Sequence, residues 1–546
     1  TKSDHYITGV TLEYSPRHWL MNRLSVGYDY NNTNDQNVLP FGYYRADLGE
    51  LWWQTWAQKL ITVDWASTLN NTIGDNFTSA FSVGAQMFDS RNETVDVNAA
   101  DFSGPGEPTM MVAALRSITG DERLRVVNAG FFFQEVFGWK DRAFITAGLR
   151  VDGNSAFGQN FGLQPYPKIS ASYVLSDHSF WPKNLIQTFK LRAAIGESGK
   201  APGAFDAVRT WDPIAGSIIS GNPEPGFTPA QLGNEDLGPE RTREYEGGFE
   251  MSALDGRVGA DFSYYYQRTF DALIPVTYPP SQGFLNTQLE NIGKLRTLGY
   301  ELKLDGTFVR TDNLEWHARM NYTTIDSKAL DIGGQTYTVN SLARSYVVQG
   351  LPVPAYYGKK VMNPNAYADP IIEEDQYLGS PYPTKIISLS SDVTLFGRLT
   401  AQALGEWQLG GHLLNAVGYQ NSRKFTYAPC YAAQEKMRSG DLSTVTALER
   451  VKCSWTTGVR DYDWWVESTD FFKLRSASLS YQLPTRFVPG GKSASLTLEG
   501  RNLLTVTDYQ GTDPETTDTR GNLFSRRDYY VFPQSRTFLL SLRVSF

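Results

Sequence analysis

The chain has 546 residues, a formal net charge of −8 and a pI near 5.4. This acidic balance argues against nucleic acid as a partner, because nucleic acid calls for a basic face and the sequence has no such patch. Hydrophobic residues make up 41% of the chain, its mean hydropathy is −0.36, and it has no run of 18 apolar residues, which excludes a helical membrane protein. A transmembrane β-barrel passes this test, because only alternate strand residues need be apolar.

Period-2 alternation predicts strands along the whole chain. The first has Tyr6, Val10 and Tyr14 on one face. The second, which follows a short turn, has Leu24, Val26, Tyr28 and Tyr30 on one face. Residues 31–44 then read as a long polar loop. Further strands are predicted near Lys59–Ser67, Ala80–Phe88, Leu124–Val136, Ala143–Val151, Lys168–Leu175, Phe189–Gly196, Glu244–Ser252, Val258–Gln267, Tyr300–Phe308, Leu314–Thr323, Ile386–Thr394, Leu399–Trp407, Phe472–Tyr481, Ala494–Leu498 and Thr537–Phe546.

Three successive strands in the middle of the chain carry charge on one side only. Their apolar positions, such as Phe262 and Leu302, alternate with charged ones. In a barrel, the apolar side would meet lipid and the charged side would line the lumen, where charge is tolerated. The residues predicted to face the lumen are Asp261, Glu301, Lys303, His317 and Arg319.

The last strand has the same two-sided character. Phe538, Leu540 and Leu542 share one face, and the opposite face carries Arg543. The strand closes on the aromatic Phe546, which is typical of the barrel-assembly signal of outer-membrane proteins. An amphipathic edge strand of a soluble sandwich is the alternative for this stretch taken by itself.

The connections between strands alternate in length. Short links of roughly 3 to 12 residues, such as 138–141 and 310–313, alternate with longer ones such as 89–122, 197–243, 326–384, 408–469 and 503–535, several of them roughly 30 to 60 residues. Short periplasmic turns and long extracellular loops are the arrangement of a transmembrane barrel. We therefore predict an all-β, antiparallel transmembrane barrel and not a set of soluble sandwiches.

About 17 strands are counted in this way, which is an odd number. Single-chain bacterial barrels have even numbers, and an open sheet edge cannot lie in lipid with unpaired backbone groups. No export signal is visible at Thr1. We expect residues 1–546 to be the C-terminal part of one larger barrel domain, with the plug domain and first strands in preceding sequence.

Several stretches resemble the SusC/RagA family of TonB-dependent outer-membrane transporters. They follow one another in the family's order: 147–158, 189–196, 234–240 with 247–250, 291–293 with 298–302, 379–383, 472–484, and 501–504 with 509–515. The resemblance implies a 22-stranded barrel of the bacterial outer membrane, filled by a plug, driven by TonB and capped by a SusD-like surface lipoprotein. The chain departs from the family in lacking plug, TonB box and signal peptide. The role of its motif Asp513-Pro514-Glu515 cannot be derived from the sequence.

The two cysteines, Cys430 and Cys453, lie in a polar, aromatic stretch outside any clear strand. In an oxidising compartment they can form a disulfide, and two free thiols are the alternative.

Aromatic residues in the long loops are the candidates for ligand binding, because planar rings stack against sugars or apolar side chains. The set is Trp211, Tyr356, Tyr357, Tyr427, Tyr431, Trp464 and Trp465. Trp464 and Trp465 precede a strand, so they can instead anchor in the aromatic girdle at the membrane surface.

No catalytic constellation emerges, because the five histidines are scattered and none stands in a zinc-ligand spacing. We predict no catalytic residues, no metal centre and no cofactor. Calcium in an extracellular loop is the one ion considered, at the acidic runs 373–375 and 513–518; a solvated loop is the alternative.

The resemblance to the SusC/RagA family implies TonB-dependent import of a bulky nutrient, an oligosaccharide or an oligopeptide, across the outer membrane. A barrel that anchors partners without transporting is the first rival. An outer-membrane enzyme using loop carboxylates is the second.

Overall fold

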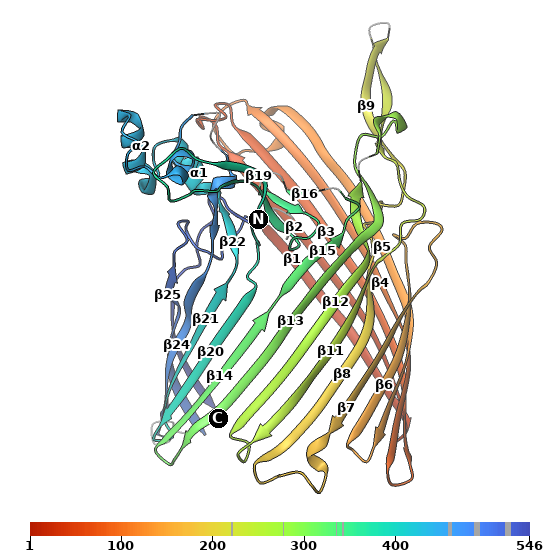
Figure 1. The fold of residues 1–546 in the computed structure, drawn as a ribbon. Coiled ribbons are helices and arrows are strands. Elements are labelled where there is room, and N and C mark those ends of the chain that lie inside the picture. Colours follow the sequence, from red (N-terminus) through yellow and green to blue (C-terminus); the bar gives the residue numbers. More distant parts are fainter. Residues whose placement is uncertain are drawn as a thin grey trace. The chain divides into compact units, whose positions relative to one another are not determined.

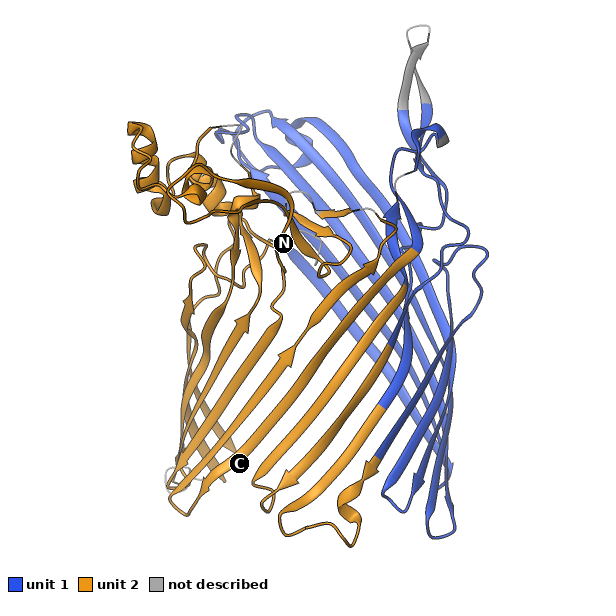
Figure 2. Cartoon of the chain, in the orientation of Figure 1, with its two compact units in different colours: residues 1–172, 194–243, 271–291 blue, residues 173–193, 244–270, 292–546 orange. Residues whose placement is uncertain are grey.

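The computed structural model describes residues 1–219, 222–276, 278–334, 336–340, 343–456, 461–484, 492–518 and 526–545; Phe546, with the predicted assembly signal, lies outside them. The chain divides into two compact units, which Figure 2 shows in different colours. Unit 1 comprises Thr1–Ser172, Ala194–Arg243 and Asp271–Asn291, and unit 2 comprises Tyr173–Ala193, Glu244–Phe270 and Ile292–Phe546. Each unit is described by itself.

Unit 1 is built on long antiparallel strands, of which β1 to β6 pair in chain order. Val10 lies opposite Val26, which lies opposite Val63, so the apolar residues share one face. The elements are β1 (Lys2–Arg17), β2 (Leu20–Leu39), β3 (Glu50–Ile73), β4 (Phe77–Phe102), a 3₁₀ turn η1 (Met110–Val112), β5 (Ala113–Trp139), β6 (Ala143–Asn154), β7 (Gln164–Val174), the hairpin β9 (Thr210–Ile219) and β10 (Asn222–Gln231), and η3 (Pro280–Gln282) (Figure 1).

Two predicted loops of unit 1 are wrong. Residues 31–39 continue β2, and most of 89–122 belongs to β4 and β5, so the loop between these two strands is only 103–112. The alternation fades there, because both faces of a strand beyond the membrane can be polar while its backbone ladder continues. At 24 to 27 residues, β3 to β5 far exceed the roughly 10 residues that cross a bilayer.

Unit 2 continues the same kind of antiparallel wall. Strands β7, β8 (Ile186–Lys200), β11 (Glu240–Ala253), β12 (Val258–Val276) and β13 (Gln288–Arg310) contribute residues to both units. The strands β14 (Leu314–Thr324), β15 (Asp326–Asp331), β20 (Lys385–Leu395), β21 (Leu399–Leu409), β24 (Phe471–Leu483), β25 (Ser493–Thr507) and β27 (Thr537–Ser545) lie in unit 2, which also holds the 3₁₀ turn η2 (Leu175–Asp177).

The predicted strand number is confirmed in the described part of the chain. Eighteen strands are of the wall type. Of these, β14 and β15 both pair with β13 in one register and are separated only at Ile325, so they count as one interrupted strand. The short turns at 18–19, 74–76, 140–142 and 311–313 also agree with the predicted short links.

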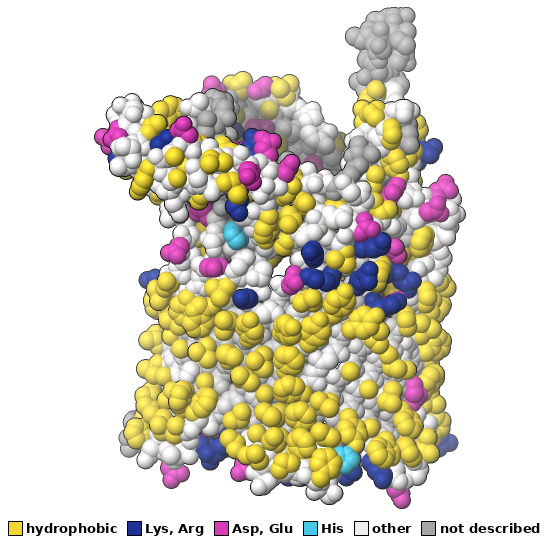
Figure 3. Space-filling view, in the orientation of Figure 1, with side chains coloured by type: hydrophobic (Ala, Val, Ile, Leu, Met, Phe, Trp, Pro, Cys, Tyr) yellow, Lys and Arg dark blue, Asp and Glu magenta, His cyan; other side chains and the backbone are white. Residues whose placement is uncertain are grey.

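The two faces of the unit 2 wall differ in character. Leu304 lies opposite Met320, which lies opposite Leu389, and this apolar row is exposed or half-exposed. On the last strands, Leu496 lies opposite Leu542, which is 66% exposed. Figure 3 shows hydrophobic side chains gathered over the strands of this face. Soluble proteins rarely expose such a surface, so the soluble-sandwich alternative is excluded.

The described residues of three long connections of unit 2, 332–384, 410–470 and 508–536, fold into a separate structure, here called the head. It holds a four-stranded sheet of β16 (Tyr337–Asn340), β17 (Ser345–Val347), β18 (Ala355–Val361) and β19 (Ile372–Gly379). A three-stranded sheet contains β22 (His412–Asn415), β23 (Val466–Ser468) and β26 (Arg527–Asp528). The helical segments are α1 (Ala416–Arg423), η4 (Ala428–Cys430), α2 (Tyr431–Ser439), α3 (Ala447–Lys452) and η5 (Asp463–Trp465).

The head helices have clear local causes that the strand-based prediction missed. At α3, the hydroxyl of Thr446 accepts from the backbone N–H of Glu449, and the carboxylate of Glu449 accepts from that of Thr446, which makes a capping box. Helix α2 ends at Gly440, whose φ of 79° is a left-handed conformation that glycine adopts without strain. The spacing Thr-x-x-Glu was the signal available in the sequence.

The head has its own apolar core, formed by residues of β18, β22 and all three helices. None of the helices in the described residues is both long enough and apolar enough to cross a bilayer.

Candidate functional site

The five residues predicted to face a lumen lie on the charged face of the unit 2 wall. Arg319 lies directly opposite Asp305 on β13. Lys303 and Glu301 precede Asp305 by two and four residues on that strand, so they share its face. Across the other edge of β14, Nδ1 of His317 lies 3.2 Å from a carboxylate oxygen of Asp392. These charged residues alternate along their strands with those of the apolar row, so they lie on the opposite face of the wall, as predicted.

Asp261 belongs to the same charged face. A Cβ added at Gly259, two residues before it, would lie 2.8 Å from the Asp305 carboxylate, so these odd positions of β12 and β13 point the same way. Arg192 on β8 donates to Asp261 at 2.7 Å and to Glu250 at 2.9 Å. The charged face therefore consists of cross-strand ion pairs, a hydrophilic lining that could contact a solute.

A buried ion cluster explains the motif Asp513-Pro514-Glu515, whose role could not be derived from the sequence. Lys473 and Arg475, both on one side of β24, meet the carboxylates of Asp513 and Glu515. The Lys473 Nζ lies 2.8 Å from Asp513 and 2.6 Å from Glu515, and Arg475 also binds Glu406 of β21 at 2.5 Å. The motif Asp513-Pro514-Glu515 thus fastens the last long loop to the wall.

Burial of this cluster is deep, since the Lys473 side chain is 3% exposed. Burial by itself would raise the pKa of Glu515, but the hydrogen bonds from Arg475 and Lys473 outweigh it and hold this pKa below its ordinary value. The Glu515 carboxylate is therefore held as an anion by two cations, Lys473 and Arg475.

The calcium prediction concerned these same acidic runs. No group of three or more potential metal-ligating side chains occurs within the described residues. Asp513 and Glu515 already bind cationic side chains, which leaves residues 373–375 on β19 as the exposed acidic run. Calcium binding there stays a prediction.

Three of the predicted ligand-binding aromatics are corrected by the structure. Tyr356, Trp464 and Trp465 are buried in the head core at 0%, 6% and 1% exposure. The hydroxyl of Tyr356 donates to the backbone carbonyl of Arg526. These rings have no free face for a ligand, and the tryptophans pack in protein and not in a membrane girdle. Loop aromatics that share a packed core cannot be told from exposed ones by sequence.

Tyr427 and Tyr357 occupy intermediate positions in the head. The Tyr427 ring stands edge-on to Trp465, with ring centroids 5.2 Å apart, and its hydroxyl donates to the carbonyl of Gln510 at 3.4 Å. Burial, helped by Glu467, raises the pKa of Tyr427 to about 12. The Tyr357 ring packs edge-on against the Tyr346 ring, with the two ring centroids 6.2 Å apart.

Two candidates keep an exposed ring. Tyr431, at the start of α2, is 50% exposed, and Trp211, on β9 of unit 1, is 51% exposed with its ring tilted against Phe284 at 5.7 Å. Trp211 lies in unit 1 and the other six in unit 2, so the seven do not form one cluster within either unit.

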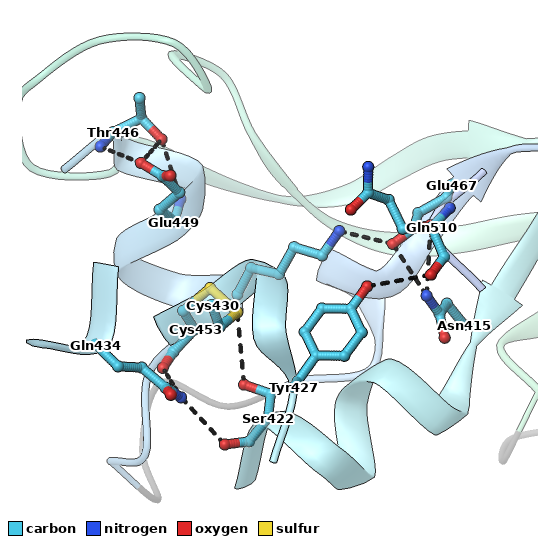
Figure 4. The surroundings of a disulfide bond; sticks show 11 residues. Asn415, Ser422, Tyr427, Cys430, Gln434, Thr446, Glu449, Cys453, Glu467 and Gln510 are labelled. Atoms are coloured by element: carbon cyan, nitrogen blue, oxygen red, sulfur yellow. Dashed lines mark hydrogen bonds and ion pairs between the residues drawn. A yellow bond between two sulfur atoms is a disulfide. The ribbon is translucent and has the colours of Figure 1, made fainter. Parts of the chain in front are cut away.

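The structure joins Cys430 and Cys453 in a disulfide within the head, so the free-thiol alternative does not hold in this fold. Figure 4 shows the polar contacts around it. The Gln434 side chain donates to the carbonyls of Ser422 and Cys453, tying α1, α2 and the end of α3 together. Lys452 binds Glu467 at 2.7 Å. The disulfide thus lies inside a packed network.

Asp463 of the head is a buried carboxylate whose pKa is raised. Asp463 accepts a hydrogen bond from the backbone N–H of Lys359 at 2.8 Å, and Arg344 Nε lies 2.8 Å from its other oxygen. Burial raises the pKa of Asp463 to about 6, despite these partners. Asp461 also binds Arg344, so two carboxylates compete for one guanidinium.

We expect the head to lose stability as the pH rises through 6. The raised pKa means that the neutral Asp463 is favoured by folding; this contribution is complete below about 3.8 and is lost as the pH passes the folded value of about 6. Hydrogen exchange of 343–379, corrected for intrinsic rates, should show weaker protection at pH 7.5 than at pH 5. Asp463→Asn should remove most of this difference, and an unchanged difference would contradict the assignment.

The comparisons with known proteins agree with this geometry. A family model described as TonB dependent receptor-like, beta-barrel matches residues 1–503. The TonB-dependent receptor P26 of Formosa agariphila is 29% identical over 464 residues, covering 77% of this chain and 46% of that protein. SusC of Bacteroides thetaiotaomicron is 21% identical over 456 residues, covering 74% of this chain and 42% of that protein. The chain spans about half the length of the curated relatives it matches.

Among solved structures, the RagAB peptide transporter matches with a TM-score of 0.81 and 17% identity, over 100% of this chain and 62% of that one. The same importer in its open-open state gives 0.82. These likenesses show the fold. Proteins of this family are transporters and receptors of the outer membrane, which accounts for the exposed apolar face of the wall. The chain belongs to the TonB-dependent receptor-like β-barrel family.

Proposed function

We propose that this chain supplies the wall and surface loops of a TonB-dependent importer that carries a bulky nutrient, an oligosaccharide or an oligopeptide, across the outer membrane. One observation carries the proposal: a wall with an apolar outer face and an ion-paired opposite face bears a separately packed, disulfide-linked head. An apolar face suits lipid, and a charged face suits a hydrated passage. A separately packed head offers a surface for partners or solute.

The rest of the transporter is part of the same proposal. We place residues 1–546 in the C-terminal part of a barrel of about 22 strands, with plug, TonB box and first strands in sequence upstream. The share of the relatives' length that the chain covers supports this placement. Each wall strand would then be one pass through the membrane.

A SusD-like surface lipoprotein is the proposed lid, and TonB the proposed source of force. Support comes from the likeness to SusC and to a transporter solved as the RagAB complex. Solute would bind between the head, the other long loops and the lid. Such a switch requires that the solute bind the closed and open states with different affinity, because equal affinity shifts no population.

The test is energised uptake by cells carrying the full-length protein. Deleting its gene should abolish growth on the nutrient, and full-length protein without its TonB box should not restore it, although its amount in the membrane is unchanged. The lid should copurify with the full-length protein. Growth and uptake that do not depend on TonB would favour the alternative, a scaffold or binding barrel without transport.

A further inference from the structure

A hollow lies in unit 1 where β2 and β4 end and β3 begins. Neither lipid contact nor core packing explains it. It has a volume of about 390 Å³ and is lined by residues of β2, β3, β4 and β5, including Asp35, Asn37, Trp52, Gln54 and Asp96. Trp52 is 61% exposed. An indole left this open in a polar hollow needs a reason.

Trp52 stands on the hydrophilic face of the unit 1 wall. The pairing of β3 with β2 and with β4 runs without interruption from Glu50 to Leu69, so parity can be counted along it. Val63 and Trp65 belong to the apolar face, whereas Trp52 has the parity of Asp64, which accepts from Gln86 of β4. Anchoring in a membrane girdle therefore does not account for Trp52.

The polar groups around this ring are brought together by the register. Asn37 lies directly opposite Trp52, and Gln54, two residues on, lies opposite both Asp35 and Asp96. The Gln54 amide donates to Asp96 at 2.7 Å, which orients that carboxylate. The strands thus bring two indoles, those of Trp52 and Trp53, into one hollow with two carboxylates and two amides.

The chemistry of this rim selects among ligands. Carboxylates accept hydrogen bonds from hydroxyl groups, amides both donate and accept, and the CH face of a sugar ring stacks on indole. No lysine or arginine is among the described residues that line the hollow, so it has no partner for a sulfate, phosphate or uronate, and Asp35 and Asp96 would repel one. Two cation-binding carboxylates alone would also suit a basic peptide, but the amides and the open indole face fit a hydroxyl-rich ring better.

We propose that this hollow is a subsite for a neutral saccharide, with one sugar ring stacked on Trp52 and its hydroxyls bound by Asp35, Asn37 and Asp96. This deepens the proposed function, on which it rests, by choosing neutral glycan over peptide and over acidic glycan. It adds to the proposed loop and lid surface a sugar-binding position at the ends of β2 and β4 and the start of β3.

The test is binding by the full-length protein in detergent to an array of neutral oligosaccharides, acidic oligogalacturonates and a lysine-containing decapeptide, followed by calorimetry of the best binder. We expect a neutral oligosaccharide to bind, and Trp52→Ala to weaken it at least tenfold. Trp52→Phe, which keeps a stacking face, should stay within about threefold of wild type. Trp56→Ala is the matched control, since Trp56 has the same parity on β3 and lies outside the lining.

A paired substitution of the acidic groups separates saccharide from peptide. Asp35→Asn with Asp96→Asn keeps hydrogen-bonding atoms, so neutral saccharide binding should fall by less than tenfold, whereas a cationic peptide would lose its partner. Failure of every neutral saccharide to bind, equal binding by Trp52→Ala and wild type, or Trp52-dependent binding of the peptide or oligogalacturonate would overturn the proposal. Saccharide binding without energised uptake would instead sink the import function and leave the subsite standing.

Discussion

Replacing Lys473 with methionine is expected to destabilise the wall by about 3 to 5 kcal/mol, because it leaves the buried Asp513 carboxylate without a cation and takes from Glu515 one of its two cations. Lys473 is 3% exposed and lies within 2.9 Å of oxygens of both Asp513 and Glu515. We would measure the midpoint of urea unfolding of the full-length protein and the hydrogen exchange of 508–518. The loop should lose protection first, since these charged contacts, together with those to Arg475, join its motif to β24.

The matched control is Lys303→Met on the charged face of the same unit. The Lys303 side chain is 49% exposed, and its nearest carboxylate, Asp305, is 3.9 Å away. A loosely paired surface lysine contributes about 0.5 kcal/mol or less, so its loss should leave the midpoint nearly unchanged. Equal effects of the two substitutions would show that the Lys473 cluster is not a buried network.

A triple replacement tests the physical reason. Lys473→Met together with Asp513→Asn and Glu515→Gln removes the uncompensated charges, and buried ion clusters replaced as a whole often cost little. We expect the triple variant to recover part of the loss of the single one. No recovery would mean that packing of the lysine stem, and not its charge, stabilises the loop.

Removing the disulfide is expected to cost the head about 3 kcal/mol, because Cys430 and Cys453 close a loop with a sequence separation of 23 residues. The double substitution Cys430→Ala and Cys453→Ala should raise hydrogen exchange throughout α1, α2 and α3. The strands of the wall should keep their protection, since the head has its own core.

Reduction of the wild-type protein with dithiothreitol is the companion measurement. It should reproduce the exchange pattern of the double alanine variant, because transient opening of the head exposes the disulfide to the reductant. Unchanged protection of the helices in both experiments would show that packing of Gln434 and Trp465, without the covalent link, is enough to hold the head together.

The strands of the wall show where the local sequence is informative. The wall was predicted strand by strand, including the shared face of Asp261, Lys303 and Arg319, because the face that a side chain occupies depends only on its position along its own strand. Strand ends were predicted poorly at β2, β4 and β5. Beyond the membrane, both faces are wet, so the alternation disappears while the hydrogen bonds persist.

The head shows where local sequence fails. Tyr356 and Trp465 were read as exposed loop aromatics but are fully buried, since their burial depends on β18, β22 and the helices meeting in one core. The short helices were not predicted, although the capping box at Thr446 and Glu449 is present in the sequence. Helices of 6 to 9 residues are too short to show a clear helical period.

The sequence by itself determined the two-sided wall, the number of its strands and the family, because these rest on periodicity and on motifs that are local in the chain. Only the tertiary structure decided which side chains meet across long separations: Lys473 with Asp513, Cys430 with Cys453, and Gln54 with Asp96. The reason is that register and loop packing bring these groups together through backbone hydrogen bonds and burial, which depend on partners that no local pattern specifies.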